Sequence, residues 1–233
     1  MNISSAIFDR SAPDLDSCPD ESLPEFAFIG RSNVGKSSLL NMLSGKLLAK
    51  VSPTPGHTKL INFFTMSKTW RLVDLPGYGY AHVARKDKSQ FNEAVNDFLE
   101  NRPNLCFVFS LIDSGLPPQE IDIEFVGWLA QNDVPFVLVF TKTDRSAAEK
   151  IQANIDAFTA RISSWFPELP TILTCSATTG AGREKLLNVI QESLTAIKKQ
   201  AKAELNAPDD GSGIPKPKPS APPKNRPDRA RPW

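Results

Sequence analysis

The sequence predicts an α/β fold with a mostly parallel six-stranded sheet that is covered by helices on both faces. Short apolar segments alternate with longer segments whose apolar residues recur at helical spacing. A glycine-containing loop separates the first such pair, and further polar loops follow later apolar segments. Strands that alternate with helices of this length form mostly parallel sheets, and the loops at the carboxyl ends of the strands hold ligands.

The first elements are read from the amino-terminal half of the chain. Residues 1–24 contain three prolines and several acids, and we expect an extension with a short strand near residues 6–8. FAFIG, at residues 26–30, is an apolar strand that runs into glycine. The segment behind it, SSLLNMLSG, has helical spacing and ends at Gly45, which is a typical helix stop. LINFFT and WRLVDLPG, which begin at residues 60 and 70, lie close enough in sequence to form a hairpin.

The remaining elements continue the alternation. Helices are expected within residues 88–102, 117–133, 146–166 and 182–200, and strands at 105–113, 135–140 and 170–177. The folded domain therefore spans residues 25–202. Residues 203–233 are rich in proline, small and charged residues, and we expect disorder there because almost nothing apolar can be buried.

Composition excludes some classes of protein. The 27 Lys and Arg nearly balance the 26 Asp and Glu, so net charge argues neither for nor against nucleic acid. The three cysteines, Cys18, Cys106 and Cys175, form no CxxC pair, which fits a reducing compartment. No apolar run approaches the roughly 20 residues that cross a bilayer, and the amino terminus lacks a signal-peptide pattern. We therefore expect a soluble, cytoplasmic protein.

The loop GRSNVGKS, from Gly30 to Ser37, matches the pattern G-x-x-x-x-G-K-[ST] between a predicted strand and a predicted helix. Its backbone N–H groups and the helix amino end would surround a phosphate, and Lys36 would bridge the β- and γ-phosphates. The Ser37 hydroxyl would bind Mg²⁺, which prefers hard oxygen ligands. The alternative is an ordinary glycine-rich turn. The predicted phosphate-binding residues are Gly30, Arg31, Ser32, Asn33, Val34, Gly35, Lys36, Ser37 and Ser38.

A phosphate loop alone fits ATPases, kinases and GTPases, so the choice of base depends on later loops. Thr141-Lys142-Thr143-Asp144 follows a predicted strand. The Asp144 carboxylate would accept both N–H groups of guanine, and the Lys142 stem would cover the ring. A site that pairs with a substrate's N–H groups rejects analogues that lack them. Cys175, Ser176 and Ala177 end the next strand, where a backbone N–H would meet the guanine O6.

These motifs predict a P-loop NTPase with a Ras-like G domain that binds GTP and GDP. Thr141 stands where asparagine is more usual. Because asparagine can also tie the base loop to the phosphate loop, and threonine can replace only part of that tie, we expect somewhat weaker nucleotide binding.

Two further loops would sense the γ-phosphate. Thr58, in KVSPTPGHTKL, would bind Mg²⁺ when that phosphate is present. Asp74 would hold a magnesium-bound water, and the Gly77 N–H would contact the γ-phosphate. The predicted residues of these loops are Gly56, His57, Thr58, Lys59, Asp74, Leu75, Pro76 and Gly77. We predict Lys36, Thr58 and Gly77 as catalytic residues and Ser37 and Thr58 as metal ligands.

The residue after Gly77 is Tyr78, where Ras-like GTPases place the glutamine that orients water. A phenol cannot align water as a carboxamide does, so we expect an intrinsic turnover of about 10⁻³ s⁻¹ or slower. Asn33 offers a substitute, because asparagine at this position helps to hold K⁺ near the phosphates in some bacterial GTPases. The alternative is that Asn33 only hydrogen-bonds its own loop.

The segments GRSNVGKSSLLN, PGHTKLINFF, LVDLPGYGYA and TKTD, with the late SA, together resemble the EngB family of the TrmE–Era–EngA–EngB–Septin group of GTPases, over about residues 5–200. The resemblance implies a small bacterial Mg²⁺-dependent GTPase that associates with the large ribosomal subunit and its rRNA during assembly. It also implies a role in cell division and septation. We expect no DNA or membrane partner, and we expect a monomer. The family usually has PGRTQ or PGKTQ where this chain has PGHTK.

Two other functions remain open at this point: a GTPase that acts in tRNA modification, and another nucleotide-using P-loop enzyme such as a kinase. TKTD and SA argue against the kinase, and no additional catalytic segment supports tRNA modification. The basic tail after residue 203 either contacts rRNA phosphates or only solubilises the chain.

Overall fold

The computed structural model describes residues 1–48, 60–78 and 85–205. The strands are β1 (Ala6–Ala12), β2 (Glu25–Gly30), β3 (Ile61–Met66), β4 (Trp70–Asp74), β5 (Leu105–Asp113), β6 (Phe136–Thr141) and β7 (Ile172–Thr174). The helices are α1 (Lys36–Ser44), α2 (Arg85–Asn101), α3 (Glu120–Gln131), α4 (Ala148–Ile162) and α5 (Arg183–Leu205), with a 3₁₀ turn at Ser163–Trp165. Every helix and strand predicted between residues 25 and 202 is present.

The strands form one sheet in the order β1-β3-β4-β2-β5-β6-β7. β3 pairs antiparallel with β4, which confirms the hairpin, and the pairs from β4 through β2, β5 and β6 to β7 are parallel. The described residues thus contain seven strands, one more than the six predicted. The additional strand is β1, which pairs antiparallel with β3 from Ala6↔Met66 to Ala12↔Ile61. The segment predicted as an extension therefore adds an edge strand to the sheet.

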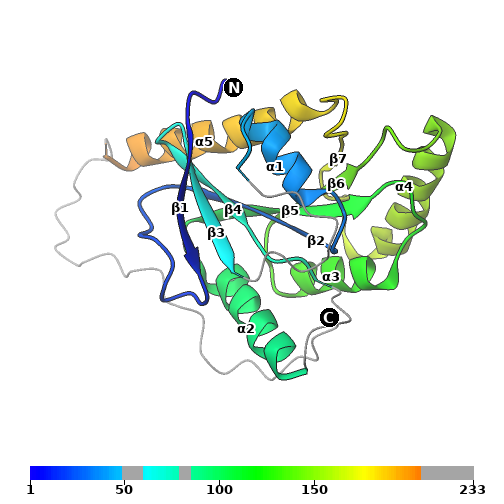
Figure 1. Cartoon of the computed structure of the whole chain (residues 1–233), viewed down its shortest axis with the longest axis horizontal. Helices are drawn as coiled ribbons and strands as arrows, with labels where there is room; N and C mark the ends of the chain where they lie inside the picture. Colours follow the sequence, from blue (N-terminus) through cyan, green and yellow to red (C-terminus); the bar gives the residue numbers. More distant parts are fainter. Residues whose placement is uncertain (49–59, 79–84, 206–233) are drawn as a thin grey trace.

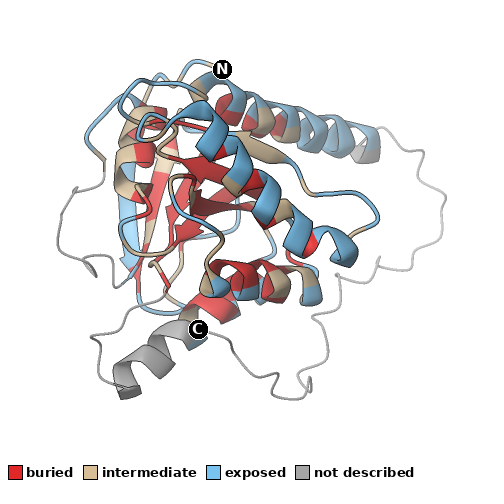
Figure 2. Cartoon of the chain, turned by 90° about the vertical axis from the view of Figure 1, so that its right-hand side faces the viewer, coloured by how far each residue is buried: buried red, intermediate tan, exposed pale blue. Residues whose placement is uncertain are grey.

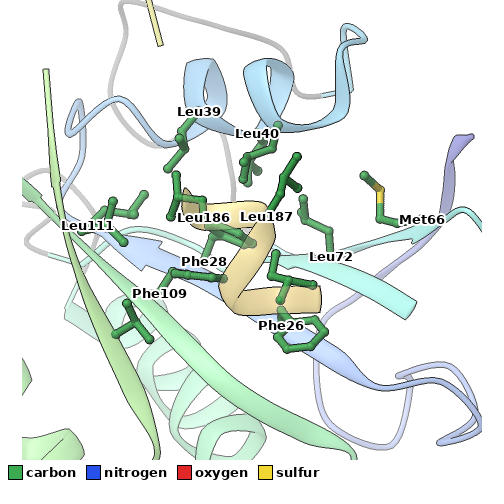
Figure 3. Packing of buried hydrophobic residues seen from close by; sticks show 14 of the residues in the cluster. Phe26, Phe28, Leu39, Leu40, Met66, Leu72, Phe109, Leu111, Leu186 and Leu187 are labelled. Carbon is green, nitrogen blue, oxygen red and sulfur yellow. The ribbon is translucent and has the colours of Figure 1, made fainter. Parts of the chain in front are cut away.

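Helices cover both faces of this sheet: α1 and α5 lie on one side and α2 and α3 on the other (Figure 1). Where their burial is described, the helices turn buried residues towards the sheet and exposed residues outwards (Figure 2). Beneath α1 and α5, Phe28 of β2 stacks on Phe109 of β5 with 4.5 Å between ring centroids, and Leu40 and Leu187 belong to the same cluster (Figure 3). This packing fixes α1, and with it the loop that precedes α1, against the central strand.

Glycines bound helix α1 at both ends. Gly35 precedes the helix with a φ of 102°, and Gly45 follows it with a φ of 67° and donates its N–H to the Asn41 carbonyl at 2.9 Å. Side chains rarely adopt this left-handed region, whereas glycine does so without strain. The stop predicted at Gly45 is confirmed.

A buried polar cluster lies at the amino-terminal end of β2, away from the glycine-rich loop. The Arg102 guanidinium donates to both carboxylate oxygens of Glu25, at 2.9 and 2.7 Å, and also to the Pro19 carbonyl at 2.7 Å. Arg71 of β4 lies 3.5 Å from the same carboxylate. These contacts tie the segment before β2 and the end of α2 to the sheet.

None of the described helices combines the length and apolar character that a membrane span requires.

Candidate nucleotide-binding site

The predicted phosphate loop lies at the carboxyl end of β2, the strand at which the order of the sheet reverses between β4 and β5. Ligands of open α/β sheets bind at such a point. A Cβ on Gly30 would lie 2.7 Å from the Leu111 carbonyl oxygen, so only glycine fits there. The Val34 N–H donates to the Arg31 carbonyl at 3.1 Å, which curls the loop towards α1.

Lys36 was predicted to bridge the phosphates and Asp74 to hold a magnesium-bound water, and the two side chains form an ion pair through Nζ and Oδ1. Asp74 ends β4, and the register of β2 and β4 sets it beside Phe28. Both side chains are buried, so the pair compensates two charges that would be costly to bury alone. The Lys36 ammonium carries three N–H donors, so a contact with one carboxylate oxygen leaves donors for phosphate oxygens.

The donors near Lys36 fit a magnesium ion. The half-buried Ser37 is the second residue of α1, and its hydroxyl is a hard oxygen of the kind that Mg²⁺ prefers. Within the described ranges, no three His, Cys, Asp or Glu side chains gather in a way that could hold a metal. Gly56, His57, Thr58 and Lys59, predicted beside the metal, lie outside the described residues.

Thr141 ties the base loop to the phosphate loop. Its hydroxyl donates to the Val34 carbonyl at 2.6 Å and lies 3.2 Å from the Ile112 carbonyl. The threonine thus makes the link between loops that the sequence led us to expect only in part. The next residue, Lys142, has a φ of 61°, and its Cε lies 3.7 Å from the position of a Cβ on Gly35. The lysine stem therefore runs over the phosphate loop.

Sequence reasoning missed Asp113, which holds that lysine. The Lys142 ammonium donates to Asp113 Oδ2 at 2.6 Å, and Asp113 Oδ1 accepts the Gly115 N–H at 3.0 Å. Asp113 is the last residue of β5, so it lies at the same edge of the sheet as both loops. An acid at the carboxyl end of a predicted strand, in LID, is the signal that points to it.

The TKTD and CSA segments meet, as predicted. The Thr143 N–H donates to the Cys175 carbonyl at 3.2 Å. Asp144 is exposed, and a hydrogen bond from Ser176 is the main cause that lowers its pKa below the usual range, so the carboxylate is available as an acceptor. Burial raises the pKa of the Cys175 thiol to about 12, which agrees with a packing role for this residue.

The segment after β4 approaches the phosphate loop closely. The Leu75 N–H donates to the Phe28 carbonyl at 3.0 Å, which extends the strand pairing into DLPG. A Cβ on Gly77 would lie 2.8 Å from the Gly30 carbonyl oxygen and 3.3 Å from the Ser32 nitrogen. Gly77 therefore touches the loop that it was predicted to join at the γ-phosphate.

The side chain of Tyr78 does not extend towards that loop but packs against α3. Its ring is 3% exposed and stacks on Phe125 of α3 with 4.5 Å between centroids. Its hydroxyl donates to Asp122 Oδ1 at 2.9 Å. Asp122 also accepts from Arg31, and sequence reasoning missed this residue as well. The available signal was a carboxylate beside Ile123 on the apolar side of a predicted helix.

This sheet order, with a phosphate loop after the central strand and a base loop hydrogen-bonded to it, is that of a P-loop GTPase. The model of the family described as 50S ribosome-binding GTPase matches residues 25–142. A probable GTP-binding protein EngB from Bacteroides fragilis is 45% identical over 192 residues, which cover 82% of this chain and 96% of that protein. A namesake from Flavobacterium johnsoniae is 44% identical over 210 residues, covering 89% and 100%.

Solved structures agree with this match. A crystal structure of a probable GTP-binding protein EngB has a TM-score of 0.59 and 25% identity, covering 74% of this chain and 99% of that one. Aquifex aeolicus Era bound to GDP.AlF4- has a TM-score of 0.60 and 24% identity, covering 73% and 56%, and shows likeness of fold alone. The chain belongs to the EngB family of GTP-binding proteins.

Proposed function

We propose that this protein is a GTP-operated switch in the assembly of the large ribosomal subunit, and that normal cell division and septation depend on it. The observation that carries the proposal is the match of residues 25–142 to a family described as 50S ribosome-binding GTPases. That range contains the phosphate loop, the DLPG segment and the first residues of the base loop. The relatives named EngB, which align over most of both chains, support the same family role.

In this proposal the loop from Gly30 to Ser38 holds the phosphates, with Lys36 as their cation. Asp144 accepts the two guanine N–H groups, and Lys142, oriented by Asp113, covers the ring. Ser37 and Thr58 hold Mg²⁺, which supplies charge neutralisation at the phosphate oxygens. The buried ion pair of Lys36 with Asp74 and the hydrogen bond of Thr141 to Val34 support this assignment, because they bring the predicted residues of three loops together.

We further propose that intrinsic hydrolysis is slow. The Tyr78 ring packs against α3, so this position offers no side chain to orient water. Without a positioned glutamine or an arginine finger, a factor of about 10³ to 10⁵ in rate is missing. Asn33 is exposed in the phosphate loop with a φ of 65°, and K⁺ held there would supply part of that factor. Rates of GTP hydrolysis that are equal in potassium and sodium buffers, with and without ribosomal subunits, would remove K⁺ from the proposal.

Co-sedimentation with purified ribosomal subunits tests the main proposal. The full chain is mixed with large or small subunits in the presence of a non-hydrolysable GTP analogue, GDP or no nucleotide. We expect pelleting with large subunits that depends on the nucleotide. Asp144→Asn is the matched control, and it should lose the response to guanine nucleotides. Equal pelleting in all three conditions would contradict a switch, and a preference for the small subunit would contradict the proposed partner.

A further inference from the structure

A buried carboxylate in the first turn of α3 joins the phosphate loop to the segment after DLPG. The Asp122 side chain is only 1% exposed. Its two oxygens lie 3.1 and 3.0 Å from Nε of Arg31, which belongs to the phosphate loop. Oδ1 also accepts the Tyr78 hydroxyl at 2.9 Å. One carboxylate therefore contacts residues from both segments predicted to meet the phosphates.

The chemistry of this group makes the contacts mutually dependent. An isolated buried carboxylate is costly, and Arg31 supplies the cation that compensates its charge. Burial is the main cause that raises the pKa of Tyr78 well above its usual value, and the neighbouring Asp122 charge raises it further. The hydroxyl therefore stays protonated and acts as the donor. Removing either donor leaves the carboxylate with fewer hydrogen bonds and alters its contact with the other segment.

These contacts bear directly on Gly77. The Tyr78 ring is held between its hydrogen bond to Asp122 and its stacking on Phe125, one turn further along α3. An isolated β-bridge joins the backbones of Arg31 and Tyr78. Gly77 precedes this bridge and lies against the Gly30 carbonyl. The two Asp122 contacts thus tie the phosphate loop and the residue after Gly77 to α3.

We propose that Asp122 is a positioning residue that holds the Gly77 N–H in place for the γ-phosphate, through the Tyr78 hydroxyl on one side and Arg31 on the other. The proposal rests on the role of Gly77 proposed above and adds that α3, through Asp122, sets the preference for GTP over GDP. A group that is already held in its binding position loses little conformational entropy on binding. The affinity is therefore raised only for a ligand that contacts this group. GTP has the γ-phosphate that would touch Gly77, and GDP does not.

Tyr78→Phe is the sharpest test, because it removes the hydroxyl and keeps the ring against Phe125. Equilibrium titration of the full-length protein with fluorescent GDP and a fluorescent non-hydrolysable GTP analogue gives the ratio of the two Kd values. We expect affinity for the GTP analogue to fall about tenfold, as the loss of one hydrogen bond to a charged group allows, while GDP affinity changes less than about twofold. Asp122→Asn should lower the ratio in the same direction, and the double variant should show much less than the product of the single effects.

Glu120→Gln is the matched control. Glu120 lies two residues before Asp122 in α3 and accepts two hydrogen bonds from Arg161 at 2.6 and 2.7 Å, but both side chains are exposed, and this pair joins α3 to α4 and not to either loop. Its loss should leave the Kd ratio unchanged. A purely structural role of the Asp122 contacts would weaken both nucleotides equally, or neither, and that result for Tyr78→Phe overturns the inference even if Asp122→Asn does not fold.

Gly77→Ala separates failure of the inference from failure of the proposed function. Its Cβ would meet the Gly30 carbonyl, so it displaces residue 77 whatever holds Tyr78. If Gly77→Ala loses preference for the GTP analogue and Tyr78→Phe does not, the Asp122 inference fails and the γ-phosphate contact stands. If Gly77→Ala also keeps the wild-type ratio, the γ-phosphate contact itself fails and the inference fails with it.

Discussion

At the scale of single residues, the chemistry of this protein depends on which carboxylates are exposed and which are buried in ion pairs. Asp74 and Asp122 are buried and paired with Lys36 and Arg31, whereas Asp144 is exposed. Asp74 ends β4, Asp144 lies in the loop after β6, and Asp122 lies in the first turn of α3. The roles of the three acids differ by environment and not by residue type. Environment also decides the role of Tyr78. This residue stands where Ras-like GTPases have a catalytic glutamine, but its ring packs against α3.

The exposed carboxylate gives the first prediction. Asp144→Asn replaces a pair of acceptors with one acceptor and one donor, which suits the N1–H donor and the carbonyl acceptor that xanthine presents where guanine has N1–H and the amine. We expect guanine nucleotide affinity to fall about a hundredfold or more and affinity for xanthosine diphosphate to rise. Competition titration against fluorescent GDP measures both. Retention of the guanine preference would contradict the role of Asp144.

A second prediction concerns the carboxylate that holds Lys142. Asp113→Asn removes the charge 2.6 Å from the lysine ammonium, so the stem over the phosphate loop should lose its fixed position. Because this pair is partly exposed, we expect GDP affinity to fall only about fivefold. Asp133→Asn, the same change in an exposed turn before β6, is the control. An Asp113→Asn variant that binds GDP like the wild type would show that Lys142 needs no such anchor.

At the scale of elements, α2 ends at a buried ion pair. Arg102, the residue after α2, donates to Glu25 at the start of β2 and to a carbonyl of the preceding segment. β2 runs from this cluster to the phosphate loop, so one strand connects the two polar ends of the sheet. The position of the end of α2 is thereby tied to the strand that carries the phosphate loop.

The third prediction follows from that ion pair. Arg102→Ala leaves a buried carboxylate with a more distant partner, Arg71 at 3.5 Å, and removing one member of a buried pair is strongly destabilising. We expect the free energy of unfolding to fall by about 3 kcal/mol in urea titrations followed by circular dichroism. Arg161→Ala, which breaks the exposed pair with Glu120, should change it little. Equal effects of the two substitutions would refute a special role for the buried cluster.

The elements themselves were largely predictable from the sequence. FAFIG is apolar over its whole length and LCFVFSLID over most of it, which is typical of strands buried on both faces, and Gly45 marks the end of α1. β1 was expected only as a short strand and outside the count of six, because its five central residues are exposed. An edge strand with so little burial lacks the alternation by which strands are recognised.

At the scale of the whole molecule, the packing of the chain lowers the reactivity of the three cysteine thiols. Burial raises the pKa of Cys18 to about 11 and that of Cys175 to about 12, and it also raises the pKa of Cys106. The thiolate is the reactive form, and below its pKa the thiolate fraction rises tenfold per pH unit. Labelling of the native protein with a thiol reagent should therefore be slow at pH 7.5, rise steadily to pH 9 without a plateau, and become fast in guanidinium chloride. A thiol that reacts at once in native buffer would contradict this.

The sequence by itself determined the order of helices and strands, the phosphate and base loops, and the edge of the sheet at which they meet. Those features depend on local periodicity and on the rule that parallel strands present their carboxyl ends together. Only the tertiary structure decided that Thr141 reaches the Val34 carbonyl, that Asp113 holds Lys142, and that Tyr78 turns away to Asp122. These contacts join residues between 29 and 107 positions apart in the sequence, so no local pattern encodes them. They arise because packing brings side chains of matching charge and hydrogen-bonding capacity within reach of one another.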